Sequence, residues 1–132
     1  MNAVKHISEK KRFSLIARAR SFKYAVRGLR IIVRTQHNFW IQIAAAALVT
    51  ALGVCLHIAP VEWCILILAM AAVLVTEAIN TAFEIDIDLT SPEYHPYAKD
   101  TKDVAAGAVL ISVIGAAAIG AIIFIPKLLF LV

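Results

Sequence analysis

Long runs of apolar residues most strongly constrain how this chain can fold. No Lys, Arg, Asp or Glu occurs in residues 38–61 or in residues 104–126. A third apolar run begins at Trp63, and it becomes long enough to cross a bilayer only if it continues through Glu77 to about Glu84. A helix needs about 20 apolar residues to cross a hydrocarbon core of about 30 Å. The sequence therefore predicts an all-α integral membrane protein. Its three transmembrane helices are expected at about residues 38–59, 62–85 and 103–126.

The composition agrees with a membrane location. Of the 132 residues, 61% are hydrophobic and 17% are charged, whereas soluble domains average about 45–50% and about 25%. A chain this short cannot bury the excess apolar surface in a core of its own. The two cysteines, Cys55 and Cys64, flank one short loop. A disulfide between them is conceivable, but two unpaired apolar thiols are the preferred interpretation.

The basic residues are concentrated before the first span, where ten of the thirteen Lys and Arg residues precede Gln36. Such a run could bind nucleic acid, but beside long apolar segments anionic lipid headgroups are the expected partner, and no nucleic acid is expected. Lys99 and Lys102 would lie on the same side of the membrane as these ten residues, and Lys127 on the other side. The positive-inside rule therefore predicts a multi-pass protein of the inner (plasma) membrane with a cytoplasmic N-terminus. A cleaved signal peptide fits poorly, because the basic region is too long.

Residues 12–36 show the pattern of an amphipathic helix that lies in the membrane interface. Residues 1–11 are polar, charged and without a period, so they are predicted to be disordered. After them, apolar residues recur at steps of three and four, with the basic residues largely between them. The apolar positions are Phe13, Ile16, Ala17, Phe22, Ala25, Val26, Leu29 and Ile32 or Val33. Gly28 is a point where this helix could bend.

A stripe of polar side chains interrupts the second span. The stripe consists of Glu77, Asn80, Glu84 and Asp88. At about 100° per residue these positions fall within a sector of roughly 60–80°, and Asp86 points to the opposite side. A charge at such depth costs about 2.5–3.5 kcal/mol, so it persists where it lines a wet cavity, pairs or does chemistry. The alternative to a functional site is a structural role, in which Glu77 and Asn80 form hydrogen bonds between helices. The adjoining loop adds Lys99, Asp100, Lys102 and Asp103, and together these groups favour a functional site.

The chemistry that this set of residues suits is a magnesium–phosphate site. Mg²⁺ prefers oxygen ligands and usually shares them with substrate phosphates. The sequence has no Walker motif, no G-x-G-x-x-G after a strand and no H-E-x-x-H. A nucleotide would therefore not be bound by a common soluble fold.

Three blocks of sequence resemble the family of small prokaryotic lipid kinases that includes diacylglycerol kinase and undecaprenol kinase. The blocks are residues 21–29 (SFKYAVRGL), residues 77–84 (EAINTAFE) followed by Asp88, and residues 98–110 (AKDTKDVAAGAVL). Their order and spacing agree over residues 12–128. The Glu62-Trp63 pair and residues 124–128 (FIPKL) are more similar to the undecaprenol kinase branch.

The resemblance implies one membrane lipid-kinase domain over residues 12–132, assembled as a homotrimer with active sites shared between neighbouring chains. Such an enzyme would transfer the γ-phosphate of ATP, with Mg²⁺, to the hydroxyl of a lipid alcohol in the bilayer, undecaprenol being favoured over diacylglycerol. By the same resemblance Glu77 would be the general base, and Glu84 and Gln36 would occupy the metal-binding positions. The nucleotide would contact Tyr24, Asn80, Glu84, Asp88, Glu93, Tyr94, His95, Lys102 and Asp103.

Two positions depart from the family pattern. Gln36 stands where the family usually has a metal-binding Glu, and Ala17 stands where an Arg is usual. A neutral amide keeps a carbonyl oxygen but loses the charge, so weaker metal binding is expected unless another ligand such as Asp86 contributes. A catalytically impaired homologue that acts as a membrane scaffold or lipid-binding protein is therefore the alternative. A cation path lined by the acidic stripe is a third, weaker hypothesis.

The last span carries small side chains that suit close helix packing. They are Ala108, Ser112, Gly115 and Ala116, with Gly120 nearby. Small residues allow helices to approach in lipid, where no hydrophobic force drives their association. This pattern predicts oligomerisation independently of the family resemblance.

Overall fold

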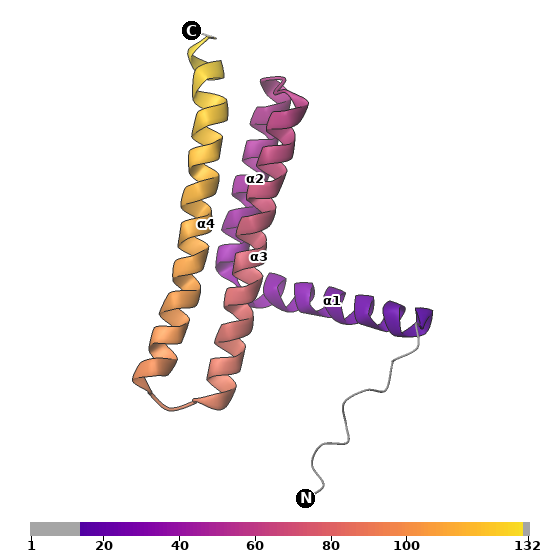
Figure 1. The fold of residues 1–132 in the computed structure, drawn as a ribbon, viewed down its shortest axis with the longest axis vertical. Coiled ribbons are helices and arrows are strands. Elements are labelled where there is room, and N and C mark those ends of the chain that lie inside the picture. The colour runs from indigo at the N-terminus through magenta and orange to yellow at the C-terminus, as the bar shows by residue number, and fades with distance from the viewer. Residues whose placement is uncertain (1–13, 131–132) are drawn as a thin grey trace, which may run out of the picture. The chain divides into compact units, whose positions relative to one another are not determined.

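The computed structural model describes residues 14–130, and over these residues the fold is helical apart from short connections (Figure 1). The helices are α1 (Leu15–Thr35), α2 (His37–Cys55), α3 (Pro60–Thr90) and α4 (Pro96–Leu129). The predicted all-α fold is confirmed. The segment predicted to be disordered, residues 1–11, lies outside the described residues. The chain divides into two compact units, one ending at Ile31 and the other beginning at Ile32, and each is described by itself.

The first unit consists of most of α1, which continues through Gly28 without interruption. Its apolar side chains, including Leu15, Ile16 and Phe22, are exposed, and so are its Arg and Lys side chains. A helix that presents apolar and basic residues together is typical of a segment bound at a membrane surface.

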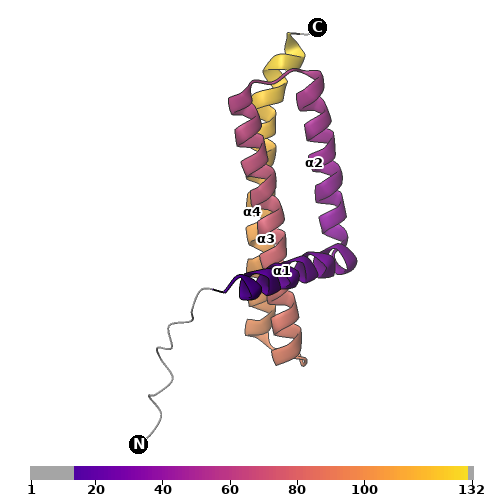
Figure 2. The same ribbon diagram turned by 90° about the vertical axis from the view of Figure 1, so that its right-hand side faces the viewer.

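The second unit holds three helices that are long and apolar enough to cross a membrane, namely α2, α3 and α4. α3 and α4 pack against each other along their length as an antiparallel pair (Figure 1). Figure 2 shows α2 running beside α3, to which it is joined by their short connection. The buried core is centred near that connection, around Ile58, Leu66, Ile123 and Phe124.

The connection between α2 and α3 differs from the one that the expected spans imply. The expected spans, about 38–59 and 62–85, leave Pro60 in the connection, but Pro60 is already the first residue of α3 and the connection lies at residues 56–59. Pro suits the first helical position, because its fixed φ matches the helix and its missing N–H would have no partner there. His57 closes the turn with a positive φ of 48°. Gly53 lets the indole of Trp63 approach, since a Cβ at Gly53 would lie 2.8 Å from the ring.

An ion pair joins the beginning of α3 to the end of α4. Lys127 Nζ lies 3.0 Å from Glu62 Oε2. The same carboxylate oxygen accepts the backbone N–H of Ala59 at 2.6 Å. Glu62 thus caps α3 and connects it to α4 at the end of the bundle that carries the α2–α3 connection.

The other ends of α3 and α4 extend beyond the apolar segments. α3 continues through the acidic residues to Thr90, and α4 begins at Pro96, so residues 91–95 alone form the loop. Further along this helix pair, Thr76 Oγ1 and Ser112 Oγ lie 2.8 Å apart. Ser112, which was predicted to favour association between chains, therefore makes a hydrogen bond within its own chain.

Candidate functional site

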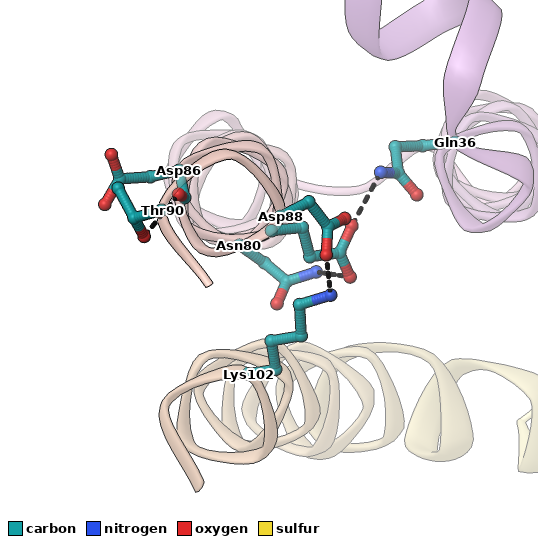
Figure 3. Close-up of polar contacts among 7 residues, drawn as sticks. Gln36, Asn80, Asp86, Asp88, Thr90 and Lys102 are labelled. Atoms are coloured by element: carbon teal, nitrogen blue, oxygen red, sulfur yellow. Dashed lines mark hydrogen bonds and ion pairs between the residues drawn. The ribbon is translucent and has the colours of Figure 1, made fainter. Parts of the chain in front are cut away.

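The polar stripe of α3 lies on one helix face, and its burial decreases along the helix. Glu77 is 1% exposed and Asn80 6% exposed, Glu84 is half-buried and Asp88 is exposed. Figure 3 shows Asp86 on the side of α3 opposite Asn80 and Asp88, as predicted from the helical period. Asp86 therefore faces away from Glu84 and is not placed to supply an additional ligand beside it.

Glu84 accepts hydrogen bonds from two amides. Gln36 Nε2 donates to Glu84 Oε2 at 2.9 Å, although the two residues are 48 positions apart, and Asn80 Nδ2 donates to Glu84 Oε1 at 3.1 Å. Figure 3 draws both contacts as dashed lines that start from the Gln36 and Asn80 side chains. Gln36 reaches α3 because it is the extended residue that precedes α2, with φ −105° and ψ 109°. The structure thus brings Gln36, Asn80 and Glu84 together.

Glu77 has a partner that the sequence analysis missed. Gln42 Nε2, on α2, donates to Glu77 Oε2 at 2.8 Å. The signal that could have found Gln42 is its amide inside a charge-free span, because such a group needs a polar partner in an apolar environment. The orientation of these amides follows from chemistry, since an ionised carboxylate only accepts hydrogen bonds and must face the N–H side.

Three buried oxygen atoms next to these contacts have no hydrogen-bond partner within the described residues. They are Gln42 Oε1, Glu77 Oε1 and Asn80 Oδ1. A buried acceptor without a partner costs about 1–3 kcal/mol, so such atoms are usually satisfied by water or by a ligand. All three belong to side chains that line one groove.

This groove has a volume of about 780 Å³ and is lined by α2, α3 and α4. Most of its lining is apolar, and it extends to Phe124 and Ile125 near the far end of α4. Its polar side chains, Asn38, Gln42, Glu77 and Asn80, belong to the first turns of α2 and to the stripe of α3. The groove therefore combines a long apolar wall with a polar end, here called the acceptor pole, at which Gln42, Glu77 and Asn80 present hydrogen-bond acceptors.

A second polar contact lies nearer the α3–α4 loop. Lys102 Nζ on α4 forms an ion pair with Asp88 Oδ1 on α3 (Figure 3). The side chains of Glu93, Tyr94 and Asp103 are exposed and make no hydrogen bond or ion pair within residues 14–130. The His95 ring lies 5.6 Å from that of Tyr97. Tyr24 is exposed and belongs to the other compact unit.

The oxygen atoms around Glu84 suit a magnesium ion better than a transition metal. Within residues 14–130 no group of three or more His, Cys, Asp or Glu side chains could hold a metal by itself. Mg²⁺ is usually bound by one or two carboxylates together with substrate phosphates. The Glu84 carboxylate is such a ligand. The Asn80 and Gln36 amides now present their N–H groups to it, and rotation of these amides would add their oxygens, so the residues fit a magnesium ion shared with a nucleotide.

Comparisons with known proteins agree with this geometry. A family model described as prokaryotic diacylglycerol kinase matches residues 23–124. The undecaprenol kinase of Bacillus subtilis is 38% identical over 128 residues, which cover 97% of this chain and 100% of the relative. The diacylglycerol kinase of Synechocystis is also 38% identical, over 83% of this chain and 63% of the relative. The diacylglycerol kinase of Helicobacter pylori is 45% identical over 40% of this chain and 41% of the relative.

The family match covers most of the chain, including the polar stripe of α3 and the groove that ends at it. A long apolar groove that ends at a buried carboxylate suits the phosphorylation of a lipid in the membrane. The chain therefore belongs to the prokaryotic diacylglycerol kinase family and is a membrane lipid kinase that uses ATP.

Proposed function

We propose that the chain transfers the γ-phosphate of ATP to the hydroxyl of a polyprenol, with undecaprenol favoured over diacylglycerol. The observation that carries this proposal is the environment of Glu77. Glu77 is 1% exposed, one of its carboxylate oxygens has no partner within the described residues, and it lies at the polar end of an apolar groove.

In this mechanism Glu77 Oε1 takes the proton of the lipid hydroxyl. The hydroxyl oxygen attacks the γ-phosphorus, the bond from that phosphorus to the β,γ-bridging oxygen breaks, and ADP leaves with the electron pair. A positioned base contributes about 10²–10⁴-fold to such a step, and the remainder comes from alignment and charge neutralisation. The apolar wall of the groove excludes water, which would otherwise compete as the acceptor.

The nucleotide would lie on the side of Glu84. Glu84, Asn80 and Gln36 would hold Mg²⁺, which neutralises phosphate charge when it is bound. Lys102 would leave Asp88 to contact the phosphates, supported by Asp103. By family resemblance the remaining contacts would come from Tyr24, Asp88, Glu93, Tyr94 and His95.

The preference for a polyprenol is supported by the polarity of the groove. Its buried pole presents three acceptor oxygens, from Gln42, Glu77 and Asn80. A polyprenol brings one hydroxyl donor and an otherwise apolar chain. Diacylglycerol adds two ester carbonyls, which are also acceptors, and each one left unpaired in the groove would cost about 1–3 kcal/mol. The similarity to the Bacillus undecaprenol kinase over its whole length points the same way.

The proposed enzyme is a homotrimer in the inner (plasma) membrane with its N-terminus in the cytoplasm. Ten of its thirteen Lys and Arg residues precede Gln36, which supports this orientation. Large apolar side chains such as Leu68, Ile111 and Ile122 are about 70–74% exposed on the single chain. Lipid tails and neighbouring copies would cover them, and a neighbour would close the open side of the groove.

The test is transfer of labelled γ-phosphate from Mg–ATP to undecaprenol and to diacylglycerol by the purified protein in mixed micelles. Wild type is expected to phosphorylate undecaprenol faster, and Glu77→Gln to lose at least about 10²-fold in rate. Glu62→Gln is the matched control, because it makes the same change at the far end of the same helix. Equal rates on both lipids would refute the polyprenol preference. Transfer to neither lipid by folded, oligomeric protein would refute the kinase and favour the impaired homologue.

A further inference from the structure

The two carboxylate oxygens of Glu77 are not equivalent. Oε2 accepts the Gln42 amide at 2.8 Å, whereas Oε1 is buried and has no partner within the described residues. The neighbouring donors are already used elsewhere. Thr81 Oγ1 donates to the Glu77 backbone carbonyl, and the Asn80 amide donates to Glu84. Within residues 14–130, the Gln42 N–H group is therefore the donor that fixes this carboxylate.

We propose that Gln42 is a positioning residue, which holds Glu77 so that Oε1 is the atom that receives the proton of the lipid hydroxyl. This inference rests on the function proposed above and adds a residue to it. Gln42 contacts neither phosphate nor metal in this scheme, and its N–H group affects the proton transfer through Glu77. Its own amide oxygen and Glu77 Oε1 both belong to the acceptor pole of the groove.

The physical reason is the freedom of a glutamate side chain. Without a donor on Oε2, the Glu77 carboxylate can rotate about its terminal torsion and exchange its two oxygens, since such torsions are soft. It would also be drawn toward other donors, such as the Asn80 amide one helical turn away. A displacement of about 1 Å from the reactive geometry can cost about 10²-fold in rate. Loss of the Gln42 contact should therefore reduce turnover while substrate binding is maintained.

The kinetic test compares Gln42→Met with wild type. Met has a side chain of similar length to Gln but no hydrogen-bond donor. Thr50→Val serves as the control, because it removes a polar group further along α2, where Thr50 donates to the carbonyl of Ala46. We expect kcat of Gln42→Met to fall by about 10- to 100-fold, with KM for ATP and for the lipid within about twofold of wild type. A rise in KM with unchanged kcat would overturn the proposal.

A double-mutant cycle tests whether Gln42 acts through Glu77. In a Glu77→Gln background, Gln42→Met should cause little further loss, because the base that it would position is gone. If the double variant instead loses activity by the product of the two single losses, the proposal is overturned. Gln42→His offers a rescue, since an imidazole restores an N–H donor at this position, and it should recover more activity than Gln42→Met. Equal activity of these two variants would also count against the proposed role.

Infrared spectroscopy tests the Gln42 contact without measuring catalysis, so it distinguishes failure of this inference from failure of the proposed function. The infrared bands of the Glu77 carboxyl group can be isolated by subtracting the spectrum of Glu77→Gln from that of wild type. In the Gln42→Met background these bands should shift, because their hydrogen-bond donor is lost. Unchanged bands would overturn the inference even if the protein is an active kinase. A shift in a protein that phosphorylates no lipid would support the Gln42 contact and refute the kinase.

Discussion

Replacement of Gln36 by Glu exchanges a hydrogen-bond donor for a second carboxylate beside Glu84. The two side chains are now joined by an N–H···O bond of 2.9 Å. Hydrogen bonds to charged groups are worth about 1.5–3 kcal/mol, and two like charges roughly 4 Å apart repel by about 4 kcal/mol at an effective dielectric constant of 20. Because Glu84 is only half-buried, the side chains can turn apart into a more polar environment. We therefore expect a net destabilisation of about 1–3 kcal/mol without divalent ions.

Magnesium should reverse the sign of this effect. Two carboxylates that repel each other in the free protein become ligands of one cation, and Mg²⁺ is usually held by one or two such groups. A gain of about 1.4 kcal/mol in metal binding corresponds to tenfold in affinity. We expect Gln36→Glu to need at least about tenfold less Mg²⁺ for half-maximal activity. Its stability should also increase more than that of wild type when Mg²⁺ and a non-hydrolysable ATP analogue are added.

Two measurements check this prediction. Thermal unfolding of the purified proteins in detergent is measured once in EDTA and once in Mg²⁺ with the ATP analogue. The difference in stability between Gln36→Glu and wild type should be negative in EDTA and positive in Mg²⁺. The Mg²⁺ dependence of the initial rate gives the affinity. Asp86→Asn is the control, because it changes a charge on the opposite face of α3 (Figure 3) and should leave the Mg²⁺ dependence as it is. If Gln36→Glu unfolds like wild type in EDTA and keeps the same Mg²⁺ dependence, positions 36 and 84 do not share a metal.

Three further substitutions test other parts of the structure. Gly53→Ala places a Cβ 2.8 Å from the Trp63 ring, so it should lower stability by about 1–3 kcal/mol, and pairing it with Trp63→Leu should recover part of the loss in the same thermal assay. Lys127→Met breaks the ion pair with Glu62 and should lower the apparent Tm slightly, by an amount that shrinks at high salt; a difference that does not change with salt would contradict this. Lys102→Met should raise KM for ATP by about 10- to 100-fold, the equivalent of one charge-assisted hydrogen bond, whereas Lys127→Met at the other end of α4 should leave that KM unchanged.

The spans and the polar face of α3 could be predicted because each depends on one helix at a time. Charge-free runs of this length have few alternatives to a spanning helix, and the helical period alone places Asn80 and Asp88 on one side of α3 and Asp86 on the other. The connection between α2 and α3 begins and ends earlier than the expected spans imply, because they left Pro60 outside the helix. The preference of Pro for the first helical position was the better guide.

Contacts between helices were harder to predict from the sequence. The pairing of Gln42 with Glu77 depends on how α2 is rotated against α3, which no periodicity within either helix specifies. Likewise, the family resemblance placed Gln36 at a metal-binding position. Nothing in the sequence indicated that its N–H group, and not its oxygen, would face Glu84. The hydrogen bond between Ser112 and Thr76 in the same chain was not predicted either. In each case the missing information was the relative position of two helices.

The amides explain how two carboxylates can lie seven positions apart in an apolar helix bundle. Gln42 donates to Glu77, and Gln36 and Asn80 donate to Glu84, so both charges are stabilised without a buried lysine or arginine. Each amide that donates its N–H group leaves its oxygen for other partners, and three buried acceptors of the groove, Gln42 Oε1, Glu77 Oε1 and Asn80 Oδ1, have no hydrogen-bond partner within the described residues. This acceptor pole favours ligands that bring a proton or a positive charge. A lipid hydroxyl meets this requirement by itself, whereas phosphate oxygens meet it only when a magnesium ion or Lys102 accompanies them.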